Sequence, residues 1–138
     1  MDNKYYLDTS IWIDVYEDRK GYNNEPLGEY GLKLLALIKA KENKIIISDL
    51  LIFELEVRYT IPEINGMLKP FEKITEKIKS TTKQKLEAKK IAEERKLPYG
   101  DALHSIIARD NNLILITRDK HFKELTDISK YYKPEELI

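Results

Sequence analysis

The sequence contains no cysteine, which excludes thiolate catalysis, zinc–thiolate sites and a disulfide framework. The absence is typical of a reducing compartment, so we expect a cytoplasmic protein. The sequence also lacks an apolar run long enough to span a membrane. Its N-terminal residues include acids and tyrosines, in contrast to the basic and apolar regions of a signal peptide. We therefore expect no membrane association.

The chain has no excess charge of either sign, because 24 basic residues balance 24 acidic ones. A general attraction to nucleic acid is therefore not indicated, and any contact with a polyanion has to come from a local patch. The length of 138 residues suits one domain over residues 1–138, large enough to bury a core without disulfides.

Apolar runs without polar alternation predict the strands. Residues 5–7 lead into Asp8, residues 44–48 include three consecutive isoleucines, and residues 113–117 form a third run. Strands of this kind are buried on both faces, as in a parallel sheet covered by helices. A weak strand is expected near Ile78, and the tail with Tyr131, Tyr132 and Pro134 is expected to be irregular.

Helical patterns fall between these runs. The predicted helices cover about 11–17, 29–41, 50–59, 68–76, 82–96 and the segment that opens at Asp101. Ser10 or Thr9 is expected to cap the first helix, and Leu86, Ile91 and Ala92 are expected to bury the fifth. The segment 20–28, with two glycines, two asparagines and a proline, is expected to be a loop. Strands that alternate with helices predict a three-layer α/β/α sandwich with a mainly parallel central sheet.

Four acids occupy comparable positions in this pattern. Asp8 and Asp119 follow two apolar strands, and Glu54 and Asp101 lie near the starts of helices. Strand carboxyl ends and helix amino ends share one edge of a parallel sheet, so the four acids can converge. Clustered carboxylates repel one another, and a hard cation such as Mg²⁺ or Mn²⁺ relieves that repulsion. The pattern therefore predicts a metal site.

These segments resemble the successive motifs of PIN domains, and most of all the single-domain toxin ribonucleases of VapBC-type toxin–antitoxin pairs. The likeness runs through Leu7–Ser10, Ile47–Leu50 followed by Glu54, Asp101–His104, and Ile116–Asp119 followed by Phe122. The resemblance implies a Mg²⁺- or Mn²⁺-dependent endoribonuclease. It also implies an RNA substrate, a small antitoxin partner and a homodimer. The loop at 20–29 is long for such a toxin.

By this resemblance, Asp8, Glu54, Asp101 and Asp119 form a catalytic acidic quartet. Asp8 and Asp119 are the leading direct metal ligands, whereas Glu54 and Asp101 act directly, through water or as a base. Thr117, and Ser10 beside Asp8, support the site. The quartet holds one or two ions, which activate water for attack on the phosphodiester.

Each signal also has a purely structural interpretation. Asp8, Asp101 and Asp119 can cap helices, and Glu54 can pair with Arg58 one turn later. We interpret His104 as a packed side chain or a donor behind the acids, His121 as a surface residue, and Asp14, Asp49 and Asp110 as solvated or capping. The segment Lys69–Lys90 has eight lysines and three glutamates, which favours a solvated face over RNA contact.

Two other classes of protein compete with a ribonuclease. A catalytically silent PIN-like module would bind RNA or protein, but it has no reason to keep four converging acids. A phosphotransfer domain also begins with an aspartate after an apolar strand. The dehalogenase-like kind of this domain needs a second aspartate two residues after the first, in the pattern Asp-x-Asp. Here that position, residue 10, is serine.

Overall fold

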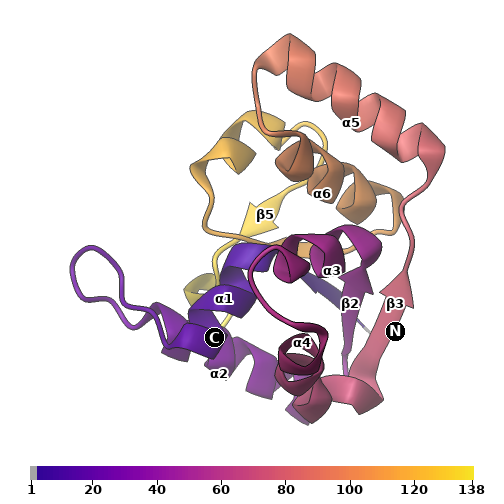
Figure 1. Ribbon diagram of the computed structural model, residues 1–138. Coiled ribbons are helices and arrows are strands. Elements are labelled where there is room, and N and C mark those ends of the chain that lie inside the picture. The colour runs from indigo at the N-terminus through magenta and orange to yellow at the C-terminus, as the bar shows by residue number, and fades with distance from the viewer. Residues whose placement is uncertain (1–2) are drawn as a thin grey trace.

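The computed structural model describes residues 3–138, and its central element is a five-stranded sheet (Figure 1). The strands are β1 Lys4–Leu7, β2 Lys44–Ser48, β3 Thr75–Ile78, β4 Ile114–Ile116 and β5 Tyr131–Tyr132. Each neighbouring pair is parallel, and the order across the sheet is β3-β2-β1-β4-β5. The predicted parallel sheet is confirmed.

Helices cover both faces of the sheet and complete the predicted α/β/α sandwich (Figure 1). The α-helices are α1 Thr9–Glu17, α2 Leu27–Ala40, α3 Asp49–Glu56, α4 Ile61–Leu68, α5 Thr82–Arg95 and α6 Tyr99–Asp110. The 3-10 segments are η1 Lys69–Ile74, η2 Lys120–Leu125 and η3 Pro134–Glu136. One core contains side chains of α1, α2, α4 and η1, and the other contains side chains of α5, α6 and η2. Within residues 3–138, no helix is long and apolar enough to cross a membrane.

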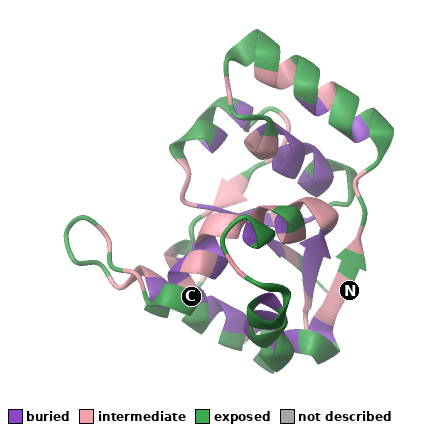
Figure 2. Ribbon diagram, viewed as in Figure 1, coloured by how far each residue is buried: buried purple, intermediate pink, exposed green. Residues whose placement is uncertain are grey.

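The alternation of side chains along each strand divides the core in two. Ile45 and Ile47 of β2 pack with α1 and α2, whereas Ile46 packs with α6 on the other face. Tyr6 of β1 joins the second core, and both it and Ile46 are buried. Figure 2 shows the resulting buried layer along the strands and the inner faces of the helices. Burial on both faces explains why these strands read as continuous apolar runs.

The C-terminal tail forms a strand, and the expectation of an irregular tail was wrong. Residues Tyr131–Tyr132 form β5, which pairs with Leu115 and Ile116 of β4. Two residues are too few to show a strand period in the sequence. The pairing with β4 is a long-range contact, and local pattern does not reveal it.

Residues 61–68 form α4, between the helices that the sequence predicts at 50–59 and 68–76. Pro62 lies in the first turn, where its missing N–H has no helical partner in any case. Thr60 and Glu63 cap the same end with reciprocal side-chain bonds. The helix expected over 68–76 is divided between η1 and β3, and α3 ends at Glu56, earlier than Tyr59.

Leu86 of α5 is 64% exposed, although its apolar character placed it in the predicted core. The buried residues of this helix are Gln84 and Ala88, one turn apart. Ile91 and Ala92 are half-buried. Leu86 lies two residues from both Gln84 and Ala88, so it faces the opposite side of the helix. The connection between α1 and α2 projects from the body of the protein, in agreement with the predicted loop (Figure 1).

Arg118 joins three elements to the end of β4. Its Nη1 donates to Glu135 Oε2 of η3 at 2.9 Å, and its Nε lies 3.6 Å from Asp14 Oδ2 of α1. The guanidinium also lies over the ring of Tyr30 in α2, 5.8 Å from its centroid. Asp14 is buried, in contrast to the expectation of a solvated or capping acid. Burial raises the pKa of Asp14, and the charge of Arg118 opposes that rise.

We expect Arg118→Ala to lower the free energy of unfolding by about 2–3 kcal/mol, because it leaves the buried Asp14 without its counter-ion. Urea denaturation at neutral pH measures this loss. Arg109→Ala is the matched control, because Arg109 pairs with Glu87 on the surface and should cost no more than about 1 kcal/mol. Equal losses in the two variants would contradict an anchoring role for Arg118.

Candidate active site

The strand order reverses beside β1, because β2 lies on one side of it and β4 on the other. Ligands of open α/β sheets bind at such a switch point, beyond the carboxyl ends of the strands. Asp8 directly follows β1, and Asp119 follows β4. A depression there is lined by Asp8, Thr9, Ser10, Ile13, Glu54, Val57, Asp101, His104 and Asp119. All four acids selected from the sequence therefore line one depression.

Asp8 is buried and caps α1, in place of the expected Ser10 or Thr9. Its backbone is extended, which lets its Oδ1 accept from Ile11 N at 3.3 Å and from Ser10 Oγ at 2.7 Å. Oδ2 accepts from Thr117, whose Oγ1 also accepts from the Asp119 N–H at 3.1 Å. Burial raises the pKa of Asp8, and these hydrogen bonds oppose the rise. Thr117 thus links two of the acids from beneath the depression.

Within residues 3–138, the hydrogen bonds that hold Glu54 all go to one of its carboxylate oxygens. Oε1 accepts from Thr9 Oγ1 at 2.5 Å and lies 2.6 Å from His104 Nε2. Burial would raise the pKa of Glu54, but the contacts with His104 and Thr9 lower it below its usual value. Arg58 turns away and pairs with Glu17 at 3.0 Å, so the alternative salt bridge with Glu54 does not form.

Asp101 and Asp119 face each other across His121. His121 Nδ1 lies 3.1 Å from Asp101 Oδ2 and 2.9 Å from Asp119 Oδ1. Burial and the charges of Asp119 and Asp8 raise the pKa of Asp101 to about 6. Asp119 also caps η2 by accepting from His121 N at 2.9 Å, which folds the histidine back over the acids.

The sequence interpretation of His121 as a mere surface residue missed this contact. The side chain is about half exposed, but its imidazole faces two acids of the depression. The available signal was its place two residues after an aspartate that caps a short helix. His104, by contrast, is packed behind the acids as expected. Asp49 accepts from Ser80, and Asp110 accepts from Arg109 and Gln84, outside the depression.

The sequence matches the family described as PIN domain over residues 5–128. This chain belongs to the PIN domain family. No curated protein matches it significantly in sequence. Proteins of this family are in general metal-dependent nucleases.

Three solved structures share the fold of this PIN domain. The VapBC2 complex of Rickettsia felis, bound to a DNA fragment from its promoter, has a TM-score of 0.66 at 22% identity and covers 94% of this chain and 98% of that chain. A toxin–antitoxin complex from Klebsiella pneumoniae has a TM-score of 0.62 at 20% identity, covering 94% and 97%. PAE2754 from Pyrobaculum aerophilum has a TM-score of 0.58 at 18% identity, covering 98% and 86%.

The donor set of this PIN domain fits a divalent cation. Ligand atoms of Asp101, Asp119 and His121 all lie within 4.8 Å of one another. Asp101 Oδ1, Asp119 Oδ2 and Glu54 Oε2 make no hydrogen bond with any residue of the described range 3–138. Carboxylate oxygens are the ligands that Mg²⁺ and Mn²⁺ prefer, and imidazole adds a softer donor.

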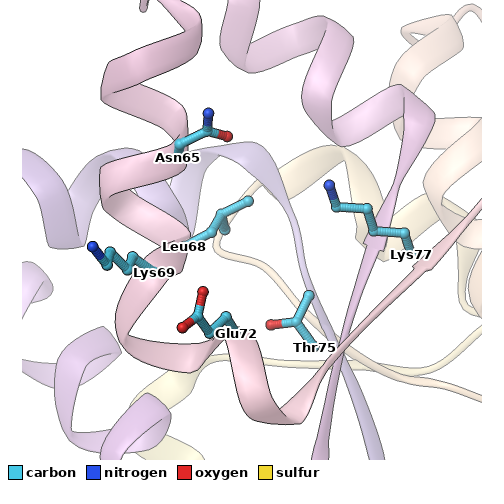
Figure 3. A pocket seen from close by; sticks show the side chains of 6 residues that line it. All are labelled: Asn65, Leu68, Lys69, Glu72, Thr75 and Lys77. Atoms are coloured by element: carbon cyan, nitrogen blue, oxygen red, sulfur yellow. The ribbon is translucent and has the colours of Figure 1, made fainter.

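A second depression of the PIN domain lies beside β3, an edge strand of the sheet (Figure 3). It is lined by Asn65, Leu68, Lys69, Glu72, Thr75 and Lys77. Thr75 is the first residue of β3, whereas the acids lie beyond the carboxyl ends of their strands. Its lining includes a single carboxylate, so it does not offer a second acidic cluster. The segment Lys69–Lys90 is itself divided, because η1 and α5 pack on opposite faces of the sheet.

We expect Mn²⁺ affinity to fall as the pH is lowered through about 6, because protonated Asp101 then has to release its proton to bind the ion. Without the ion, the folded protein holds this proton more tightly than the unfolded chain. The contribution of Asp101 to stability, measured as the difference from Asp101→Asn, should therefore decrease as the pH rises from 3.8 to about 6, and saturating Mn²⁺ should remove that decrease.

Isothermal titration calorimetry at several pH values measures the affinity, and thermal denaturation with and without Mn²⁺ measures the stability. Asp101→Asn is the control, because it lacks the proton and should show a weaker dependence on pH. An affinity for Mn²⁺ that stays constant between about pH 5 and 7.5 would contradict the assignment.

Proposed function

We propose that this PIN domain is a divalent-metal-dependent endoribonuclease that hydrolyses RNA phosphodiester bonds. The convergence of Asp8, Glu54, Asp101 and Asp119 in one depression carries the proposal. Three of these acids keep a carboxylate oxygen free of hydrogen bonds within the described residues. Such oxygens at a switch point are suited to a cation and a phosphate oxygen together.

The four acids would hold Mg²⁺ or Mn²⁺, with Asp8 and Asp119 as the leading direct ligands. Such an ion supplies charge stabilisation at the phosphate and activation of water when it is bound. Ser10 and Thr117 fix the Asp8 carboxylate by donating to its two oxygens. Glu54 Oε2, which accepts no hydrogen bond from residues 3–138, is available to orient the attacking water.

A groove that continues from Glu54 supports a single-stranded substrate. Its first part is lined by Asp49, Leu50, Phe53, Glu54, Ser80, Lys85, Tyr99, Gly100 and Leu103. Its second part, along α5, shares Lys85 and Tyr99 and adds Lys89. Phe53 and Tyr99 are 67% and 42% exposed. Exposed rings beside lysines are suited to stacked bases and a phosphate backbone.

We also propose that residues 1–138 form a single domain that acts as the toxin of a type II toxin–antitoxin pair in the cytoplasm. Two of the solved structures with this fold are toxin–antitoxin complexes, which supports a small antitoxin partner. A homodimer is part of the same proposal. The alternative is a silent PIN-like module that binds RNA or protein, and it gives no reason for the uncompensated charge around Asp101.

We expect the purified protein to cleave a pool of structured RNAs with Mg²⁺ or Mn²⁺ and to lose that activity in EDTA. Asp8→Asn should reduce the cleavage rate at least about 100-fold, because it removes a charged ligand. Asparagine is also a good helix cap, so the variant should retain α1 and fold. Gel analysis of the RNA products with time measures the rates.

Asp127→Asn is the matched control for Asp8→Asn, since Asp127 pairs with Arg95 on the surface away from the acids. It should cleave at the wild-type rate. Cleavage by Asp8→Asn at that rate would indicate a contaminating nuclease and refute the proposal. RNA binding without cleavage by the wild type would favour the silent module.

We expect Tyr99→Ala to raise the KM for a short single-stranded RNA at least fivefold with little change in kcat, because stacking of a base is worth about 1–3 kcal/mol. Lys85→Ala should also weaken binding and lower the salt dependence of affinity by roughly 0.7 in the log–log slope. Tyr22→Ala removes a fully exposed tyrosine from the α1–α2 connection, outside the groove, and should leave KM unchanged. Equal effects of the two tyrosine variants would exclude the groove as the substrate path.

A further inference from the structure

A chain of buried hydrogen bonds runs behind Glu54 into the core. Tyr6 Oη lies 2.6 Å from Ser48 Oγ and 2.6 Å from His104 Nδ1. His104 Nε2 lies 2.6 Å from Glu54 Oε1. Tyr6, Ser48 and His104 are all buried, and Glu54 and His104 are the members of the chain that line the depression. The chain therefore connects the interior of the protein to one acid of the site.

Only one assignment of the protons in this chain gives every donor an acceptor. An ionised carboxylate only accepts, so His104 Nε2–H donates to Glu54. In the neutral imidazole, Nδ1 then accepts, and the Tyr6 hydroxyl donates to it. The Tyr6 oxygen in turn accepts from the Ser48 hydroxyl, whose own oxygen accepts from Leu51 N at 3.0 Å. The opposite order would leave the Ser48 proton without an acceptor among residues 3–138.

The members of the chain belong to separate elements that the core holds in place. Tyr6 lies in β1 two residues before Asp8, Ser48 ends β2 and caps α3, and His104 lies in α6 one turn after Asp101. Burial keeps the Tyr6 phenol neutral, because it raises the pKa far above its usual range. Tyr6 is thus a permanent donor on the strand that Asp8 directly follows.

The free oxygen of Glu54 is confined from the other side. A Cβ at Gly100 would lie 2.6 Å from Glu54 Oε2, so only glycine leaves room for the carboxylate there. Oε1 already receives bonds from Thr9 and His104. The carboxylate therefore has little freedom to rotate, and its orientation depends on which nitrogen of His104 holds the proton.

We propose that Tyr6 and His104 are positioning residues, which fix the Glu54 carboxylate toward the acidic depression through a single histidine tautomer. The inference rests on the proposed ribonuclease function, in which Glu54 orients the attacking water. If His104 held its proton on Nδ1, the bare Nε2 would face the carboxylate and repel it. Tyr6 prevents that state by occupying Nδ1 with its own proton.

The tautomer is tested without reference to activity. Nitrogen-15 NMR of the imidazole, with two-bond couplings to the ring protons, should show His104 protonated on Nε2 and unprotonated on Nδ1 in the wild type. Tyr6→Phe should produce a mixture of tautomers, whereas Tyr5→Phe should not. Tyr5 is the matched control, because it lies on the same strand but packs in the opposite core. Protonation on Nδ1 in the wild type would overturn the proposal.

The positioning role is tested by kinetics on a short RNA with Mn²⁺. We expect Tyr6→Phe to lower kcat roughly 10- to 100-fold with KM nearly unchanged, since Glu54 is misdirected while the groove is intact. His104→Gln keeps an N–H donor near the position of Nε2 and should retain most of kcat. His104→Asn has a shorter side chain whose amide reaches only the position of Nδ1, so it cannot donate to Glu54 and should lose kcat.

The double variant separates positioning from general loss of structure. A glutamine amide has no tautomer for Tyr6 to select, so Tyr6→Phe should cause no further loss of kcat in the His104→Gln background. A full additional loss, or equal kcat for His104→Gln and His104→Asn, would overturn the positioning role. The two His104 variants preserve the test if Tyr6→Phe does not fold.

Failure of this inference is distinct from failure of the proposed function. A wild-type protein that cleaves RNA, with Asp8→Asn inactive and Tyr6→Phe fully active, leaves the ribonuclease intact and refutes the positioning chain. A wild type without cleavage in any metal refutes the ribonuclease and, with it, the role assigned to the chain. The NMR result then describes only the tautomer.

Discussion

The crowding of four carboxylates at the carboxyl edge of the sheet is the constraint on which the site depends. The fold brings them together from β1, α3, α6 and the segment after β4, and each one carries a different set of compensating contacts. Asp8 accepts from Ser10, Ile11 and Thr117, and Glu54 accepts from Thr9 and His104. Among the described residues, Asp101 has His121 as its one hydrogen-bond partner, and burial with the charges of Asp119 and Asp8 raises its pKa to about 6. The uncompensated charge is therefore concentrated where a cation can bind.

These contacts divide the four acids into rigid and adaptable members. Asp8 accepts from the buried Thr117, and Glu54 accepts from the buried His104. The orientation of both carboxylates is therefore set before any ligand arrives. Asp101 and Asp119 contact a histidine whose side chain is half exposed, so fewer packing contacts fix its position. A preorganised pair beside an adaptable pair would suit the proposed ribonuclease site, which has to hold both an ion and a polymeric substrate.

Much of this arrangement could be predicted from the sequence, because buried parallel strands leave continuous apolar runs and place the residues after them on one edge. The apolar runs located Asp8 and Asp119, and Glu54 was located by its place near the start of the helix that follows one of these runs. The pattern did not reveal what depends on distant contacts. Three such contacts are the pairing of Tyr131 with β4, the approach of His121 to Asp101, and the burial of Asp14 against Arg118. The polarity pattern of the local sequence gives no sign of any of them. The exposure of Leu86 has the same origin, because the packing partner of a helix, and not its apolar content, decides which side is buried.

The C-terminal segment shows that support for the site extends beyond the part of the chain that carries the family likeness, which ends at residue 128. Thr117 N donates to Tyr132 O at 3.0 Å, and Arg118 pairs with Glu135. Thr117 in turn donates to Asp8 and accepts from the Asp119 N–H. Residues 131–136 therefore fix the backbone at Thr117, which positions Asp8 and Asp119. Family motifs mark the groups that do chemistry, whereas their geometry depends on segments with no motif of their own. The reason is physical. A position that needs a carboxylate accepts only Asp or Glu, whereas a supporting strand accepts any residues that pair and pack there.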